Sequence, residues 1–270
     1  MINVKNLSFS YRNGHGTPLR NITFSLYDGD FLLILGESGS GKTTLIRALT
    51  GLIPHFYKGK FEGEVIIDGL NTKKVSPFEL ASKIGVVFQN PENQIITMTV
   101  YDELAFSLES RGMPENVIKK KINNITKELG IEYLLERRTT QLSGGELHLV
   151  VLASILLLDV QTIILDEPLA NLDPWNAIKI LSLISKLNKN GKTIILVEHR
   201  IDTVLEYTSV NKIAVLHEGK LVGFGSLDIL YNENITKYIG VPTVVYIAKK
   251  LNLQKKVFRS YELQKVLQLY

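Results

Sequence analysis

Five short apolar runs constrain the fold of this chain most strongly. Each is rich in leucine or β-branched residues and is bounded by glycine, proline or charge: FLLILG, IGVVFQ, TIILDEP, TIILVEH and KIAVLHEG. Such runs predict buried strands. Helical patterns over residues 42–51, 144–158 and 174–190 alternate with them, as is typical of a parallel sheet. We therefore expect an α/β core.

Other segments predict additions to that core. The first 30 residues and residues 63–69 have the pattern of half-exposed strands, which indicates a small antiparallel β layer over one flank. Residues 93–158 are mostly helical in pattern, and so is the chain after residue 225. We expect one domain over residues 1–225, with a helical subdomain inserted at about 93–158, and a helical C-terminal appendage over residues 226–270.

Composition excludes several classes of protein. The chain has 270 residues, of which 45% are hydrophobic and 21% charged, so it can bury a full core in one or two domains. Its longest apolar stretches, such as residues 149–158, are well short of the roughly 20 residues of a membrane span. The N-terminus lacks the features of a secretory signal. Since there is no cysteine, disulfides, thiolate metal sites and cysteine nucleophiles are excluded.

A net charge of +4 raises the question of an anionic partner. The densest basic group lies near the C-terminus, in a segment without a recognisable nucleic-acid-binding motif, and consists of Lys249, Lys250, Lys255, Lys256 and Arg259. Solvated helix faces account for this group at least as well. We expect no nucleic-acid partner.

The sequence GESGSGKT, residues 36–43, matches the phosphate-loop pattern between a predicted strand and a predicted helix. Backbone N–H groups of such a loop surround phosphate oxygens at the positive end of the helix. Lys42 would reach the β and γ phosphates, and the Thr43 hydroxyl would bind Mg²⁺. The expected nucleotide-binding residues here are Gly36, Glu37, Ser38, Gly39, Ser40, Gly41, Lys42, Thr43 and Thr44.

Polar side chains follow three of the predicted strands. Asp166 and Glu167 end one of them, at the edge where ligands bind in open parallel sheets. Alone, such a pair is more often a solvated turn or a helix cap. Beside a phosphate loop it predicts hydrolysis, with Asp166 holding Mg²⁺ and Glu167 orienting the attacking water. His199 and Gln89 follow two other strands, so we expect His199 at the γ-phosphate or the water, and Gln89 at Mg²⁺ or the water.

The phosphate loop, Gln89, LSGGE, LDEP, NLD and His199, in this order, resemble the nucleotide-binding subunit of ATP-binding cassette (ABC) proteins, which are P-loop NTPases. The resemblance covers nearly all of the chain to about residue 225. It implies that the signature LSGGE, residues 142–146, acts on ATP held by a second cassette, through Ser143, Gly144 and Gly145 at a helix start. Two cassettes would then clamp two ATP molecules head to tail.

The signature also has a purely structural interpretation, because Ser143 and Glu146 have the spacing of a capping box. Both interpretations can hold together. The signature helix departs from the usual family pattern, which has glutamine in place of Glu146 and then glutamine and arginine in place of His148 and Leu149.

Two further positions follow from the resemblance. Residues 171–173 resemble the family's D-loop, which joins the two sites across the dimer and brings Asp173 to the nucleotide. Tyr11, at the end of an early strand, resembles the aromatic residue that stacks on adenine. A tyrosine at a strand end is about as often simple packing, so this alternative stays open.

One segment distinguishes among cassette proteins. Residues 86–114, with FQNPENQI and a later V-x-DELAF, look like the ATPase components of energy-coupling-factor (ECF) and cobalt-type importers. In that group the stretch around Gln94 helps form the groove for a helix of the membrane partner. Residues 240–251 resemble the group's C-terminal region, which often supports dimer contact. The alternative for residues 86–114 is an ordinary loop and amphipathic helix.

The resemblance implies an ATPase subunit on the cytoplasmic face of the membrane that powers import of a vitamin, metal ion or similar micronutrient. It implies ATP and Mg²⁺ as cofactors. The implied partners are a second cassette, identical or different, an integral transmembrane subunit and a membrane-embedded substrate-binding subunit. A conventional ABC transporter subunit for another solute is one alternative. A soluble cassette ATPase of repair, translation or assembly is another, although such proteins usually carry two cassettes or a long coiled coil.

Overall fold

The computed structural model describes residues 1–12, 14, 18–170 and 172–268 of the chain. Its centre is a six-stranded sheet with the strand order β10-β9-β3-β8-β7-β6. The strands from β9 to β6 are parallel, and β10 alone runs antiparallel to its neighbour β9. Their bounds are β3 Phe31–Leu35, β6 Ile84–Val87, β7 Thr162–Asp166, β8 Thr193–Val197, β9 Lys212–His217 and β10 Lys220–Gly225. The predicted α/β core with a mostly parallel sheet is confirmed.

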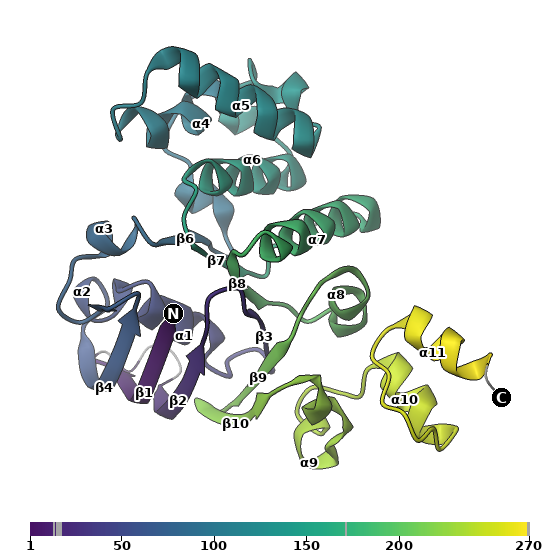
Figure 1. Cartoon of the computed structure of the whole chain (residues 1–270). Helices are drawn as coiled ribbons and strands as arrows, with labels where there is room; N and C mark the ends of the chain where they lie inside the picture. Colours follow the sequence, from purple (N-terminus) through teal and green to yellow (C-terminus); the bar gives the residue numbers. More distant parts are fainter. Residues whose placement is uncertain (13, 15–17, 171, 269–270) are drawn as a thin grey trace.

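A second sheet of four antiparallel strands covers one flank of the core, as predicted (Figure 1). Its order is β2-β1-β4-β5, with bounds β1 Ile2–Tyr11, β2 Leu19–Leu26, β4 Gly59–Ile67 and β5 Leu70–Asn71. Strand β4 begins at Gly59, earlier than the predicted segment. Its first residues pair with the end of β1, where Gly59 lies opposite Tyr11.

Residues between β6 and β7 are mostly helical, which agrees with the predicted helical subdomain. Figure 1 shows α4, α5 and α6 together at the end of the molecule away from the antiparallel sheet. The helices before β9 are α1 Lys42–Leu49, α2 Leu52–His55, α3 Pro77–Leu80, α4 Val100–Glu109, α5 Glu115–Leu129, α6 Gly144–Leu157, α7 Pro174–Lys189 and α8 Ile201–Tyr207.

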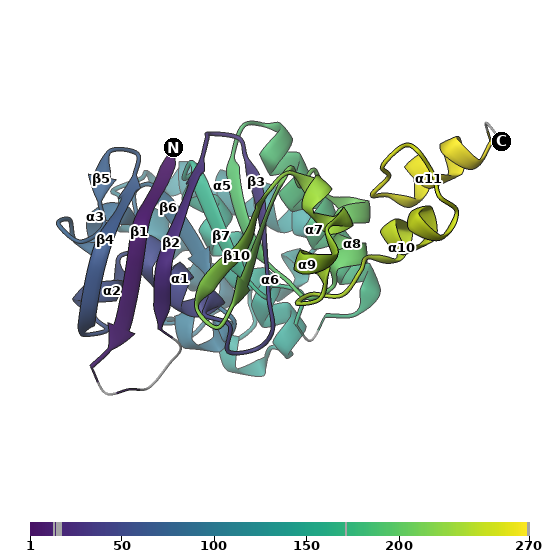
Figure 2. The same ribbon diagram turned by 90° about the horizontal axis from the view of Figure 1, so that it is seen from below.

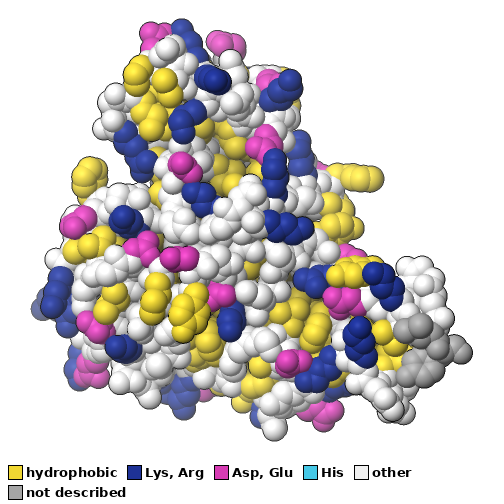
Figure 3. All heavy atoms as spheres, in the orientation of Figure 1, with side chains coloured by type: hydrophobic (Ala, Val, Ile, Leu, Met, Phe, Trp, Pro, Cys, Tyr) yellow, Lys and Arg dark blue, Asp and Glu magenta, His cyan; other side chains and the backbone are white. Residues whose placement is uncertain are grey.

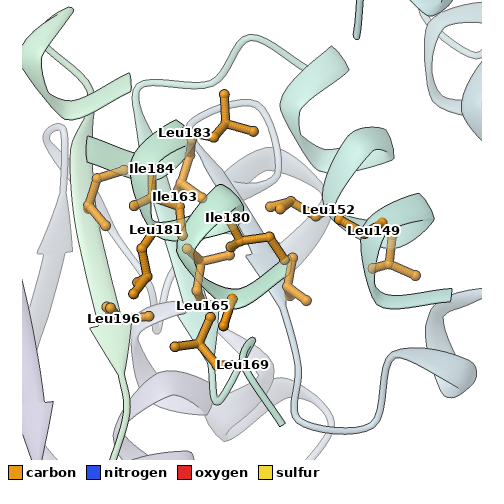
Figure 4. Packing of buried hydrophobic residues seen from close by; sticks show 14 of the residues in the cluster. Leu149, Leu152, Ile163, Leu165, Leu169, Ile180, Leu181, Leu183, Ile184 and Leu196 are labelled. Carbon is orange, nitrogen blue, oxygen red and sulfur yellow. The ribbon is translucent and has the colours of Figure 1, made fainter. Parts of the chain in front are cut away.

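The central sheet is buried on both faces because its side chains alternate between two apolar clusters. In β3, Phe31, Leu33 and Leu35 pack with α6, α7 and the helical subdomain. Leu32 and Ile34 pack with α1 and the antiparallel sheet. Figure 4 shows the first cluster, in which leucines and isoleucines of α7 meet those of β7 and β8. The residues at the strand ends are therefore supported by a sheet that is packed on both faces.

The chain after β10 is helical, as predicted, with η4 Leu227–Tyr231, α9 Glu233–Thr236, α10 Thr243–Lys250 and α11 Ser260–Leu267. Figures 1 and 2 place α10 and α11 on the side opposite the antiparallel sheet. Both are tied to α8: Asp202 accepts from the Thr243 backbone at 2.7 Å, and Arg259 donates to the Leu205 carbonyl at 2.9 Å. Leu227 and Leu230 belong to the apolar cluster that contains Phe31, Leu33 and Leu35, called the main apolar cluster below. The domain boundary at residue 225 stays a prediction.

The surface carries both signs of charge. Figure 3 shows lysine and arginine side chains interspersed with aspartate and glutamate on the face drawn, with apolar patches between them. Among the residues that the structure describes, no helix is both long and apolar enough to cross a membrane.

Candidate functional site

The phosphate loop connects the end of β3 to α1 and depends on its glycines. Gly36 has φ 148°, and a Cβ there would lie 2.3 Å from the Leu216 carbonyl oxygen, so only glycine fits. Gly41, at φ 107°, is the residue before the first turn of α1. At these glycines the loop therefore exposes backbone groups, with no side chain in the way, to a ligand at the N-terminus of α1.

Two side chains of this loop are set up for an anionic ligand. The Lys42 amine donates to the Gly36 and Glu37 carbonyl oxygens, at 2.9 Å each. Burial lowers the pKa of Lys42, while the charges of Glu167 and Asp166 act in the opposite direction. Ser40 is buried, and its hydroxyl has no hydrogen-bond partner among the described residues. A phosphate oxygen would satisfy both groups.

Thr43 and Asp166, the two residues predicted to bind Mg²⁺ here, lie next to each other. The Thr43 hydroxyl donates to Asp166 Oδ2 at 3.2 Å, across the gap between α1 and β7. Burial raises the pKa of Asp166 to about 6, and the charge of Glu167 adds to this effect. A carboxylate, a hydroxyl and phosphate oxygens are the hard ligands that Mg²⁺ prefers. The residues present fit the ion, which would neutralise phosphate charge when bound.

Glu167 lies at the centre of the predicted catalytic group. One carboxylate oxygen accepts from the Gln89 amide at 2.8 Å, and the other lies 3.0 Å from His199 Nε2. An imidazole protonated on Nε2 would donate to this carboxylate oxygen. Glu167 itself has φ 54°, an uncommon backbone conformation for a residue with a side chain. The structure thus brings together the three residues predicted to be catalytic.

Sheet register explains why residues so far apart in sequence meet. Asp166 pairs with Val197, Leu165 with Val87, and Ile34 with Val197. The carboxyl ends of β3, β6, β7 and β8 are therefore level, and the residues that follow them share one edge of the sheet. Gln89 also lines a cavity of about 300 Å³ together with Thr43 and Asp166.

The signature forms the start of α6, as predicted. Ser143 and Glu146 make the capping box: the Glu146 backbone donates to the Ser143 hydroxyl at 3.3 Å, and the Ser143 backbone to Glu146 Oε2 at 2.9 Å. Glu146 also accepts from the Tyr133 hydroxyl at 3.3 Å and lies 3.5 Å from Arg137. A Cβ on Gly144 would meet no atom within 4 Å, so this backbone is open to another molecule.

His148 and Leu149, where the signature helix departs from the family pattern, are both buried. Leu149 packs in the main apolar cluster. Burial lowers the pKa of His148, and the nearby Gly144 backbone acts in the opposite direction. Sequence reasoning missed Tyr133 and Arg137, which hold the signature helix through Glu146.

Tyr11 is half-buried at the edge of the phosphate site. Its hydroxyl lies 3.2 Å from the Thr44 hydroxyl and accepts from Arg47 at 3.1 Å. Its ring meets Phe9 and Tyr57 edge to face. Packing therefore accounts for much of this side chain, and stacking on adenine stays a prediction.

Asp173 caps α7 by accepting from the Trp175 and Asn176 backbones at 3.0 and 3.1 Å. The structure gives the side chain a local role, and the predicted contact with a nucleotide across a dimer stays a prediction. Residue 171, the first of the predicted D-loop, lies outside the described residues.

Comparison with known proteins agrees with this geometry. Residues 19–170 match the family described as ABC transporter. The chain belongs to the ABC transporter family. An ABC transporter ATP-binding protein of Pyrococcus abyssi is 40% identical over 269 residues, which is 97% of this chain and 95% of that protein. The energy-coupling factor transporter ATP-binding protein EcfA1 of Mycoplasma mobile is 36% identical, covering 99% of this chain and 95% of its own.

Two solved ABC structures share the fold. CbiO1 from Clostridium perfringens, described as part of the ABC transporter complex cbiONQ, has a TM-score of 0.73 and 30% identity, with 94% of each chain covered. The ATP-binding cassette MJ0796, solved as a dimer in a post-hydrolysis state with ADP and Pi, has a TM-score of 0.74 and 30% identity, covering 84% of this chain and 99% of that one.

These comparisons establish the general activity of this ABC protein. It is an ATPase subunit of a transporter, and ATP is its substrate. ABC ATPases dimerise and work with transmembrane components, as the dimeric MJ0796 and the cbiONQ complex illustrate. The phosphate loop and the edge of β6, β7 and β8 are where this fold would hold and hydrolyse ATP.

Proposed function

We propose that this ABC ATPase powers an ECF-type importer for a vitamin, metal ion or similar micronutrient. It works on the cytoplasmic face of the membrane with a second cassette, an integral transmembrane subunit and a membrane-embedded substrate-binding subunit. ATP binding closes the pair of cassettes and hydrolysis reopens it.

The chemistry follows from the contacts at the sheet edge. Lys42 and the backbone of the phosphate loop would hold the β and γ phosphates, and Thr43 and Asp166 would hold Mg²⁺. Glu167 accepts a hydrogen bond from the attacking water, while Gln89 and His199 fix the orientation of its carboxylate. Positioning and charge stabilisation, rather than covalent chemistry, supply the catalysis of phosphoryl transfer.

The segment around Gln94 is the observation that carries the importer proposal. The Gln94 side-chain amide is anchored at the end of β6. It donates to the Val86 carbonyl at 3.0 Å and accepts from the Phe88 backbone at 2.7 Å. The segment is therefore fixed to β6 while Ile96 and Met98, 64% and 81% exposed, face outward. Exposed apolar side chains beside a fixed loop suit an apolar helix of a membrane subunit.

Two of the relatives favour the same subgroup. One is named as an energy-coupling factor transporter ATP-binding protein, and it aligns with 99% of this chain. The other is described as part of the cbiONQ complex, and 94% of this chain superposes on it. Both alignments extend well beyond residue 225, so the helical appendage is part of the similarity.

The test is to tag the full chain in its native cell, solubilise the membranes gently and identify what co-purifies. The proposal expects an integral transmembrane subunit together with a small membrane-embedded binding protein. Recovery with a transmembrane subunit of another architecture would assign a conventional ABC transporter. Recovery from the soluble fraction alone would contradict a transport function.

Matched variants locate the contact. Met98→Glu places a charge on the exposed apolar surface beside Gln94 and should reduce recovery of the transmembrane subunit. Tyr27→Glu makes the same change at another exposed position, 65% exposed in the antiparallel sheet region, and should leave recovery unchanged. Equal recovery with both variants would place the membrane contact elsewhere.

A further inference from the structure

Glu198 is a buried carboxylate that the predicted mechanism does not use. It directly follows β8 and is 4% exposed. Oε1 accepts from the Leu169 backbone at 3.0 Å, and Oε2 accepts from the His199 backbone at 3.0 Å. One side chain therefore joins the loop after β7 to the loop after β8.

The loop after β7 is the turn that carries Glu167. The Ala170 backbone donates to the Glu167 carbonyl at 3.1 Å, which closes a four-residue turn. Leu169 lies inside that turn; its side chain packs in the main apolar cluster beside Leu165 (Figure 4). Its backbone N–H points to Glu198, so this turn is fixed at its centre.

These contacts form a closed ring. Glu167 is joined to Leu169 through the turn, Leu169 to Glu198, Glu198 to the backbone of His199, and the His199 imidazole back to Glu167 at 3.0 Å. A shift of Glu198 would move the imidazole and the catalytic carboxylate relative to each other. The other links in this ring are the backbone of the two loops and the contact between His199 and Glu167. Glu198 is therefore the one side chain of the ring that is not itself predicted to be catalytic.

A glutamine at this position could not accept both of the backbone hydrogen bonds that Glu198 accepts. Burial raises the pKa of Glu198, and this effect exceeds the lowering by its backbone hydrogen bonds and by the charge of Arg200. Burying the charge is therefore unfavourable on balance. A glutamine has one acceptor oxygen and a donor group, so one of the two backbone N–H groups would face another donor.

We propose that Glu198 is a positioning residue for ATP hydrolysis, which holds the Glu167 turn and His199 in the register where the imidazole contacts the Glu167 carboxylate. This inference rests on the proposed roles of Glu167 and His199. It assigns no contact between Glu198 and ATP. Loss of the bridge should therefore slow hydrolysis without weakening nucleotide binding.

The test compares Glu198→Gln with Asp30→Asn in the full chain. Asp30 is the matched control: it is 8% exposed and accepts from the Tyr27 backbone at 2.8 Å, but it precedes β3 at the opposite end of the sheet. Glu198→Gln should lower kcat by roughly 10- to 100-fold, since displacements near 1 Å cost about that much. Its KM for ATP and its affinity for the fluorescent analogue TNP-ATP should change less than twofold.

Asp30→Asn should lower the melting temperature without lowering kcat. Loss of kcat in both variants, or a parallel loss of TNP-ATP affinity in Glu198→Gln, would mean general destabilisation and would overturn the proposal. If Glu198→Gln does not fold, Glu198→Asp is measured instead; it keeps the charge but is one methylene too short to bridge both loops, and the same separation of kcat from KM is expected.

Glu167→Gln, measured alongside, separates this proposal from the proposed catalytic roles. Unchanged kcat in Glu198→Gln with an inactive Glu167→Gln would overturn the positioning role alone. Normal turnover by Glu167→Gln would overturn the catalytic assignment on which it rests.

Discussion

Replacing Asp166 by asparagine should stabilise the protein in the absence of nucleotide. Asp166 is 1% exposed, and burial raises its pKa to about 6 from an ordinary 3.8. For an acid with a raised pKa, the folded state binds the proton more tightly than the unfolded state does. The ionised carboxylate therefore reduces the free energy of unfolding above pH 6, and this penalty declines as the pH falls toward 3.8.

The size of the effect follows from the shift. Two pKa units correspond to about 3 kcal/mol at pH 8, and the penalty falls to about half of that at pH 5. The asparagine side chain would carry no charge and could still accept from Thr43. For a chain of this length 1 kcal/mol changes the melting temperature by about 2 °C, so we expect Asp166→Asn to melt about 6 °C higher at pH 8 and about half as much higher at pH 5.

The assay is thermal unfolding of both proteins without nucleotide or Mg²⁺ between pH 5 and pH 8. Glu109→Gln, at an exposed position on α4, serves as the control. Its melting temperature should equal that of the unmodified protein at every pH. A melting temperature of Asp166→Asn equal to or below that of the unmodified protein at pH 8 would refute the reasoning. Since the variant also loses a metal ligand, it should be more stable but inactive.

Three further changes test other parts of the site. Lys42→Ala should abolish TNP-ATP binding, whereas Lys189→Ala, exposed on α7, should bind normally; binding by Lys42→Ala would contradict the phosphate role. Ser143→Ala should lower the melting temperature by about 2 °C, because losing a helix cap costs about 1 kcal/mol, and an unchanged value would argue against the capping box. Gly36→Ala should lose nucleotide binding because its methyl group would overlap the Leu216 carbonyl; normal affinity would mean that the loop can relax.

Much of this site could be predicted because it depends on local patterns and one topological rule. The phosphate loop is continuous in sequence, and its glycines are required by backbone geometry at positions such as Gly36. Gln89, Glu167 and His199 are far apart in sequence, but each follows an apolar run. The carboxyl ends of parallel strands share an edge, which is enough to predict that the three meet.

The remaining features depend on contacts that no local pattern encodes. Glu198 is one charged residue at a strand end, and its partner Leu169 is 29 positions away. Tyr133 and Arg137 contact Glu146, which is 13 and 9 positions later in the sequence, and no helical or strand period predicts such contacts. Strand β10 is interrupted by Gly223 and ends at Gly225, so its antiparallel pairing with β9 depends on the turn between them more than on a strand pattern.

ATP hydrolysis by Glu167→Gln tests the central claim most directly. The unmodified chain and the variant are compared at saturating ATP and Mg²⁺, with TNP-ATP binding measured in parallel. We expect equal binding, a loss of turnover of at least about 100-fold, and accumulation of closed dimers with ATP. Turnover by the variant at the unmodified rate would contradict the assignment of Glu167 and, with it, the catalytic centre described above.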